Sequence, residues 1–310
     1  MPNNTTDARH QEALRLRNAG WSYGRIAREL GYGNYPSAAR YAVMAALRNT
    51  VSTSTSEDRQ FGVEAEFYGI TPTMAVEALR AVGINAEWLT YTHEVTSTWK
   101  LVYDASVTST GTGIGRGLEL VSPILKGEEG LKDLEKALNA LKNAGGKVNT
   151  TCGLHVHIDT AGMNGTQRKN FFNGYVKNQN VMDRLVSSSR RNNRQYTCRY
   201  STSQAEQYAD ALEHGRNVHN RYFTVNVMSM AKYGTLEFRQ HQGTLNGKKA
   251  VAWVQMLLGM AKTAQATTEE TTTVFGSVAD LLDGIGIEGT TKAFILRREA
   301  VLNRSTAVAA

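Results

Sequence analysis

The sequence predicts an α+β fold that combines an antiparallel sheet of short strands with a set of longer helices. Five short segments alternate apolar residues with Glu, His, Asn or Arg, the pattern of strands that bury one face and keep the other polar. Several longer segments repeat apolar residues at helical spacing. Three short helical patterns come first in the chain, so a small helical domain is expected to precede the sheet.

Composition places the chain among globular proteins without a membrane segment. It has 310 residues, 41% of them hydrophobic, which is enough for one large domain and a small one. The longest apolar stretch, residues 251–261, is too short to span a bilayer, and the first residues contain no apolar signal core. The two cysteines, Cys152 and Cys198, form no Cys-x-x-Cys pair, which is typical of reduced thiols. These features predict a cytoplasmic protein with no membrane partner.

Positive charge is concentrated at the start of the chain. The net charge is +7, and residues 1–50 hold seven arginines against three acidic residues, a local charge of +4. The remaining 260 residues hold 28 basic and 25 acidic residues, a charge of +3. A basic first domain is therefore predicted.

Residues 1–50 are expected to form this domain from three helices, at 8–19, 22–30 and 38–47. Gly20 and Gly31 end the first two, and Ser22 can cap the second. The stretch Gly20-Trp21-Ser22-Tyr23, followed by Ile26-Ala27 and Leu30-Gly31-Tyr32, resembles the helix-turn-helix of sigma-factor and resolvase-type DNA-binding domains. That resemblance implies duplex DNA as a partner of residues 1–48, with the third helix as the reader. An arginine-rich helical adaptor that binds no nucleic acid is the alternative.

Residues 51–59 predict a linker, because the stretch is rich in serine and threonine and has little to pack. Residues 60–310 then form the second domain, which is expected to carry the chemistry.

The first strand of that domain carries a closely spaced pair of carboxylates. In Phe61-Gly62-Val63-Glu64-Ala65-Glu66-Phe67 the apolar residues share one face, while Glu64 and Glu66 share the other. Two residues along a strand span ~6.7 Å. The repulsion between the two charges is then about 2.5 kcal/mol at an effective dielectric constant of about 20. A solvated face would tolerate this pair, whereas a concave face would need a cation to neutralise it.

The same pattern recurs in four later segments, which favours the second interpretation. The polar faces of these segments carry Glu119; His155, His157 and Asp159; Asn226; and Glu237 with Arg239. Ordinary solvated strands are richer in Lys, Ser and Thr than in His and isolated Glu. The repetition therefore predicts one polar site spread across an antiparallel sheet.

The rest of the chain supplies helices, strands and two polar loops. Helices are predicted at 72–82, 130–144, 166–185, 248–264, 278–282 and 292–302, and further strands at 99–107, 222–228 and 234–240. The glycine-rich stretch 108–117 is expected to be a mobile loop without a Walker lysine. The stretch 187–200 carries Arg190, Arg191, Arg194 and Arg199. These arginines either face solvent or, beside a carboxylate-rich pocket, bind phosphate or an acidic substrate.

Residues 60–260 resemble the amidoligases, which belong to the carboxylate–amine ligase superfamily of glutamine synthetase and glutamate–cysteine ligase. The resemblance rests on Phe-Gly-Val-Glu-Ala-Glu-Phe, Gly-Leu-Glu-Leu-Val-Ser-Pro (117–123), Cys-Gly-Leu-His-Val-His-Ile (152–158), Val-Asn-Val and Thr-Leu-Glu-Phe-Arg-Gln-His-Gln-Gly-Thr (235–244), in this order. It implies a curved antiparallel sheet with helices on its convex side. ATP and divalent metals are expected in the concavity.

The resemblance also implies roles for individual residues. Glu64, Glu66, Glu119, His155 and Glu237 match metal ligands, and Arg239 matches the arginine that holds the transferred phosphate. Arg239, Glu237 and His155 are the expected catalytic residues, and Arg239, Arg190, Arg199 and Asn226 the expected nucleotide-binding residues. Asp104, His157 and His241 are site candidates whose roles the sequence leaves open.

The function that follows is ATP-dependent ligation of a carboxylate to an amine through an acyl phosphate. Oxygen-rich ligands with one histidine favour Mg²⁺ or Mn²⁺ over zinc. The substrates are a carboxylate and an amine, each from a small molecule or a protein. Two alternatives stay open: a metallohydrolase with His155 and His157 as zinc ligands, and a DNA-binding protein whose ligase-like domain is inactive.

Overall fold

The computed structural model describes residues 4–18, 21–49, 59–90, 95–108, 116–191, 193, 195–270 and 273–304. Within these ranges an eight-stranded sheet forms the centre of the fold, and its strands follow the order β2-β3-β4-β1-β6-β8-β7, with β5 paired to β1. The strands are β1 (Gln60–Phe67), β2 (Ala86–Trp88), β3 (Trp99–Tyr103), β4 (Leu118–Val121), β5 (Leu125–Lys126), β6 (Gly153–Asp159), β7 (Val225–Asn226) and β8 (Thr235–Gln242). The two edge strands of the path, β2 and β7, do not pair with each other, so the sheet is open.

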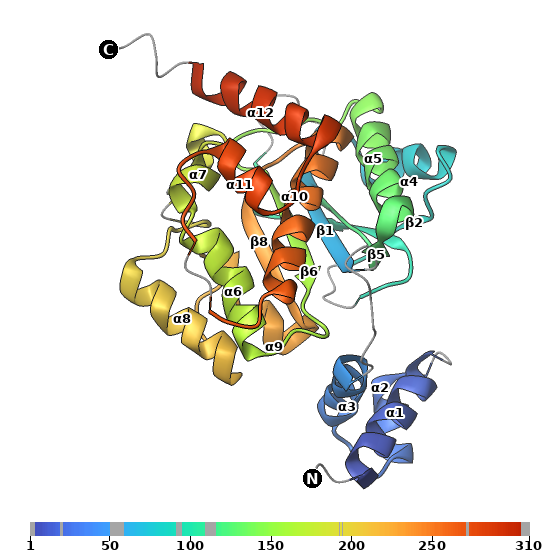
Figure 1. The fold of residues 1–310 in the computed structure, drawn as a ribbon. Coiled ribbons are helices and arrows are strands. Elements are labelled where there is room, and N and C mark those ends of the chain that lie inside the picture. The colour runs from blue at the N-terminus through green and yellow to red at the C-terminus, as the bar shows by residue number, and fades with distance from the viewer. Residues whose placement is uncertain are drawn as a thin grey trace.

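Helices cover one face of the sheet (Figure 1). The helices after β1 are α4 (Pro72–Ala81), α5 (Gly127–Asn143), α6 (Gly165–Val176), α7 (Gln179–Asp183), α8 (Thr202–His214), α9 (Ser229–Tyr233), α10 (Gly247–Ala266), α11 (Val278–Gly284) and α12 (Gly289–Asn303), with a short 3₁₀ helix, η2 (Ser188–Arg190). None of the described helices combines the length and the apolar character needed to cross a membrane.

The main core lies between the sheet and helices α5, α6 and α10. Val63, Leu120 and Phe238 of the strands pack in one cluster with Leu138 of α5 and Tyr175 of α6, and all five are buried. These strand residues alternate with the acidic and histidine residues, so the apolar face of each strand is fixed by burial. The polar residues consequently gather on the opposite face of the sheet.

The predicted α+β class is confirmed, with corrections to individual elements. The sheet is mixed rather than purely antiparallel, because β2 pairs with β3 in the parallel sense. The helix predicted at 166–185 is two helices, α6 and α7, and the strand predicted at 222–228 shortens to β7. Helix α8 was not predicted. Most of the glycine-rich stretch 108–117 lies outside the described residues.

The first three helices form an apolar cluster of their own. They are α1 (Asn4–Asn18), α2 (Tyr23–Glu29) and α3 (Pro36–Asn49). Leu16 of α1, Ile26 of α2 and Val43 of α3 are buried together. Ser22 caps α2, since its Oγ accepts a hydrogen bond from the Arg25 amide at 3.3 Å. The linker predicted at 51–59 lies almost entirely outside the described residues, so the domain division stays a prediction.

Candidate active site

The pairing register of the sheet brings the predicted polar residues side by side. Glu66 of β1 lies directly opposite Glu119 of β4, and Glu64 lies opposite His155 of β6. His157 in turn lies opposite Glu237 of β8. Side chains at directly opposed positions are 4.5–5.5 Å apart at Cβ in typical sheets, roughly the reach of one bound ion. Strands β4, β1, β6 and β8 therefore form a single polar surface. We call its side chains the carboxylate cluster: Glu64, Glu66, Glu119, His155, His157 and Glu237.

His155 is the hub of the carboxylate cluster. Its Nδ1 lies 3.3 Å from Glu64 Oε2 and 3.8 Å from Glu237 Oε1, and its Nε2 lies 3.6 Å from Glu66 Oε1. The ring is buried, with 7% of its side chain exposed. One imidazole thus contacts carboxylates from two strands, β1 and β8.

Gly153 at the start of β6 allows this close packing. Its amide donates a hydrogen bond of 2.6 Å to Glu66 Oε2, which fixes that carboxylate. A Cβ at position 153 would lie 2.8 Å from both Arg190 Nη2 and His155 Nε2, closer than side-chain atoms tolerate. Because Gly153 has no side chain, Arg190 and His155 can both pack against its backbone.

His157 is the second histidine of the cluster, and its role was left open by the sequence. Its Nδ1 lies 3.0 Å from Thr235 Oγ1, and its buried Nε2 has no hydrogen-bond partner, although Glu64 Oε1 lies 3.6 Å away. Burial alone would lower the pKa of His157, but the contact with Glu64 and the charge of Glu237 outweigh burial and raise it. In its neutral form this buried nitrogen offers a lone pair, so a cation could bind there in place of the proton.

Glu237 is held from two sides by its neighbours. Asn226 of β7 donates to Glu237 Oε2 at 2.5 Å, and Arg239 forms an ion pair with Glu237 Oε1. Burial would raise the pKa of Glu237, but Arg239 and His157 dominate and lower it, so the carboxylate is ionised at neutral pH. Arg239 keeps its buried Nε without a partner in the described structure. Part of its guanidinium is therefore free to bind an anion.

Glu64 and Glu119 differ in how far their negative charge is compensated by neighbouring groups. Burial would raise the pKa of Glu64, but the hydrogen bond with His155 and the close contact with His157 hold it well below its ordinary value. Glu119 has no such partner. Its pKa is raised well above the ordinary value by burial and then by the charges of Glu64 and Glu66. A bound cation would remove this penalty on ionising Glu119.

Three groups of donor atoms in the described chain are close enough to share a cation. They are Glu64, His157 and Glu237; Glu64, Glu119 and His155; and Glu66, Asp104 and Glu119, with the donor atoms of each group within 4.8 Å of one another. Two groups combine carboxylates with one histidine, and the third offers oxygen alone, a donor set typical of Mg²⁺ and Mn²⁺. None of these three groups contains both histidines, which disfavours the zinc-hydrolase alternative.

The structure places Arg190 and Arg199, the two loop arginines expected to bind nucleotide, in different surroundings. Arg190 is buried, and its guanidinium donates to the carbonyl oxygens of Arg239 at 2.9 Å and Gln240 at 3.3 Å. Arg190 therefore supports the backbone of β8 at Arg239 and Gln240. Arg199 pairs with Asp183 at 2.8 Å and Asn180 at 2.6 Å, in a network with α7 rather than with the cluster.

A β-bulge in β8 explains why His241 is not part of the cluster. Leu154 pairs with His241 and Val156 with Phe238, so Arg239 and Gln240 together oppose His155 alone. The extra residue turns His241 towards the helices, where its ring lies 4.9 Å from that of Trp253. Burial lowers the pKa of His241 to about 3. Sequence alternation by twos would have kept His241 on the same face as Arg239.

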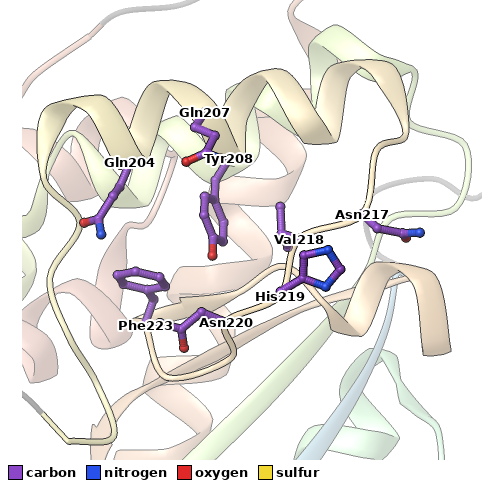
Figure 2. Close-up of a pocket in the computed structure, with 8 residues that line it drawn as sticks. All are labelled: Gln204, Gln207, Tyr208, Asn217, Val218, His219, Asn220 and Phe223. Carbon is purple, nitrogen blue, oxygen red and sulfur yellow. The ribbon is translucent and has the colours of Figure 1, made fainter.

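A separate cavity lies away from the carboxylate cluster. It has a volume of about 320 Å³ and lies between α8 and the segment leading into β7; Figure 2 shows the residues that line it. It is lined by Gln204, Gln207, Tyr208, Asn217, Val218, His219, Asn220 and Phe223, none of which belongs to the carboxylate cluster. Amides and aromatic rings without carboxylates are unsuited to binding a divalent cation. This cavity therefore offers no donor group like those on the sheet.

A comparison with known protein families identifies the family of the chain. Residues 57–261 match the family described as "Putative amidoligase enzyme". The match spans about two thirds of the chain and contains every member of the carboxylate cluster, so the protein belongs to this amidoligase family. A comparison with curated proteins found no match.

Several solved structures are similar to the chain at low identity. A GmaS–ADP complex is 10% identical, with a TM-score of 0.41 over 87% of this chain and 75% of that one. A bifunctional glutathione synthetase from Pasteurella multocida is 11% identical, with a TM-score of 0.38 over 82% of this chain and 49% of that one. A glutamine synthase homolog is 12% identical, with a TM-score of 0.39 over 87% of this chain and 71% of that one.

Proposed function

We propose that the chain is an ATP-dependent carboxylate–amine ligase that forms an amide or peptide bond through an acyl phosphate. The observation that carries this proposal is the carboxylate cluster with Arg239 at its edge, in a chain that belongs to the amidoligase family. A buried cluster of acids is costly unless cations neutralise it, and a metal–nucleotide complex supplies both the cations and a ligand for the arginine.

The residues present fit Mg²⁺ or Mn²⁺. Glu64, Glu119 and His155 would hold one ion, Glu64, His157 and Glu237 a second, and Glu66 with Asp104 extends the oxygen donors on the β4 side. Bound metal ions would neutralise negative charge on the phosphate oxygens of ATP. The uncompensated charge around Glu119 and the unpartnered Nε2 of His157 are the two features of the chain that support such binding.

The reaction needs an activated carboxylate, because a free carboxylate is a poor electrophile. An oxygen of the acid substrate attacks the γ-phosphorus of ATP, the bond to ADP breaks, and an acyl phosphate forms. The amine then attacks the acyl carbon, inorganic phosphate leaves, and the amine nitrogen loses a proton. Electrostatic stabilisation of the moving phosphoryl group is the main contribution required of the protein.

Arg239 is the residue best placed to hold the transferred phosphoryl group. Its charge is fixed, its planar fork suits phosphate oxygens, and its Nε has no partner in the described structure. Glu237, itself held by a hydrogen bond from Asn226, pairs with the guanidinium, and Arg190 supports the backbone of β8 through the carbonyls of Arg239 and Gln240. Arg190 is thus a positioning residue in this proposal. Arg199, which pairs with α7, is given no part in it.

The direct test is a panel of carboxylates and amines screened for ADP release with Mg²⁺. A ligase releases ADP and phosphate together with an amide product, and only when both substrates are present. Hydrolysis of an amide without ATP would instead support the metallohydrolase. A folded protein that neither binds nor turns over ATP with any pair would contradict the ligase and support an inactive ligase-like domain. We expect the cytoplasm, which supplies ATP and Mg²⁺, to be its location.

A further inference from the structure

The arginines of the first three helices are mostly occupied within their own region. Arg15 pairs with Glu12 at 2.6 Å, Arg17 donates to the Trp21 carbonyl at 3.0 Å, and Arg25 lies 3.5 Å above the Trp21 ring. Arg9 lies more loosely over Tyr32, at 5.8 Å. The net charge of the region therefore overstates the positive charge that is available to a partner.

Two arginines with described side chains, Arg28 and Arg40, have no such partner. Arg28 lies in the last turn of α2, and Arg40 lies in the first half of α3. Residues 30–49, which include all of α3 and the turn before it, contain no aspartate or glutamate. Arg40 thus lies in an acid-free segment, near Lys232, whose pKa is lowered by burial and then by the charge of Arg40, whereas Arg28 is followed directly by Glu29.

The outer face of α3 also exposes aromatic and hydroxyl groups. Ala39, Ala42 and Val43 are buried against the other two helices, and helical spacing places Ser37 and Arg40 away from them. Tyr41 lies at the edge of this face, where its ring meets that of His10 of α1 edge-on at 6.1 Å. Tyr41 is 64% exposed, and Tyr35 in the turn before α3 is 70% exposed. Large rings left this open beside an arginine are typical of a contact surface.

We propose that this α3 face, formed by Tyr35, Ser37, Arg40 and Tyr41, binds duplex DNA together with Arg28 of α2, with α3 in the major groove. The major groove admits one helix, and an arginine with a serine near the start of that helix can reach base edges. Arg28 at the end of α2 is placed to contact a backbone phosphate. Duplex RNA is disfavoured, because its major groove is too narrow for a helix. This binding is independent of the proposed ligase activity.

The test uses the full chain and a fluorescein-labelled DNA duplex of mixed sequence, followed by anisotropy across a range of salt concentrations. Wild type is expected to bind with an affinity that falls steeply with salt. Arg40→Ala should weaken binding about tenfold and reduce the slope of log affinity against log salt by about one. Tyr41→Ala should weaken binding without changing that slope, since no charge is lost.

Arg15→Ala is the matched control, because it removes the same charge from α1 outside the α3 face. It should leave binding within about twofold of wild type, since Arg15 is already paired. Equal losses in Arg15→Ala and Arg40→Ala would overturn the α3 face. Tighter binding to an RNA duplex of the same sequence, or no binding to DNA at low salt, would overturn duplex DNA as the partner. Circular dichroism of each variant checks that the helices are retained.

Discussion

The carboxylate cluster and the three-helix region are both rich in charge, but the charges are uncompensated in the first and mostly paired in the second. In the sheet, acids from β1, β4 and β8 converge, and Glu119 is left without a counter-charge. In the three-helix region, most arginines are satisfied by a nearby ring or carboxylate at the surface. Buried charges that converge interact strongly, whereas exposed pairs contribute little. The comparison teaches that placement, and not the count of charges, identifies a site.

The largest expected effect comes from Glu64→Gln, which removes a donor shared by two of the three donor groups. We expect Mg²⁺–ATP to lose its stabilisation of the fold, about 2.7 kcal/mol at a ligand concentration about a hundred times Kd. The ligand-free melting temperature should change little, because relief of Glu119 offsets the lost histidine contacts. Thermal melting with and without Mg²⁺–ATP measures both. The control is Glu206→Gln on the exposed surface of α8; an equal ligand-induced shift in both variants would contradict the assignment.

Arg239→Lys should have the next largest effect, and mainly on turnover. Lysine keeps the positive charge beside Glu237 but loses the planar fork that grips phosphate oxygens. We expect turnover to fall roughly twentyfold, about 1.8 kcal/mol of transition-state stabilisation, with ATP affinity changed far less. Steady-state kinetics of ADP release together with ATP titration separates the two. A loss in affinity as large as the loss in turnover would argue that Arg239 binds nucleotide without acting on the transferred group.

His241 makes stability depend on pH. Its pKa falls from 6.5 to about 3 on folding, so the unfolded chain binds the proton more tightly. The resulting stability is complete above about pH 6.5 and is lost as the pH falls towards 3, by at most about 1.4 kcal/mol per pH unit. Chemical denaturation at several pH values measures this slope. His241→Asn should flatten the slope between pH 6 and pH 4; an unchanged slope would assign the acid sensitivity to other groups.

The smallest effect is expected from removing residues 1–50 altogether. The apolar cluster of α1, α2 and α3 shares no residue with the main core, so the remaining fragment should fold and melt as the full chain does. Near-UV circular dichroism and thermal melting of residues 51–310 test this expectation. An insoluble or molten fragment would mean that the two regions stabilise each other.

Sequence alternation predicted most of the sheet and the cluster, because period-two burial fixes which face each strand residue occupies. The opposition of Glu64 to His155 and of His157 to Glu237 follows from antiparallel pairing in register. Asp104 lay at the end of a predicted strand and was left without a role. The structure assigns it to the third donor group, a contact between separate strands that no local pattern reveals.

Other features depended on tertiary structure and could not be read from local patterns. The bulge that redirects His241 adds one residue to an otherwise regular strand, and no residue pattern in Phe238-Arg239-Gln240-His241 indicates it. Helix α8 begins with a capping box, in which Ser201 and Gln204 bond each other's backbone amides, a signal that was present and overlooked. Helix α6 ends at Val176, but apolar residues recur at helical spacing on both sides of this point. The sequence pattern therefore did not show that one helix ends there.

The bulge in β8 also limits how this chain can change in length. Because Arg239 and Gln240 together oppose one residue of β6, deleting a single residue there would restore simple alternation to β8. His241 would keep Leu154 as its partner and stay on the helix side, so the residues after the deletion would keep their faces. Deleting Gln240 would instead remove one of the two carbonyls that Arg190 binds. The extra residue of β8 therefore matters for how Arg190 is held, and not for which later side chains face the core.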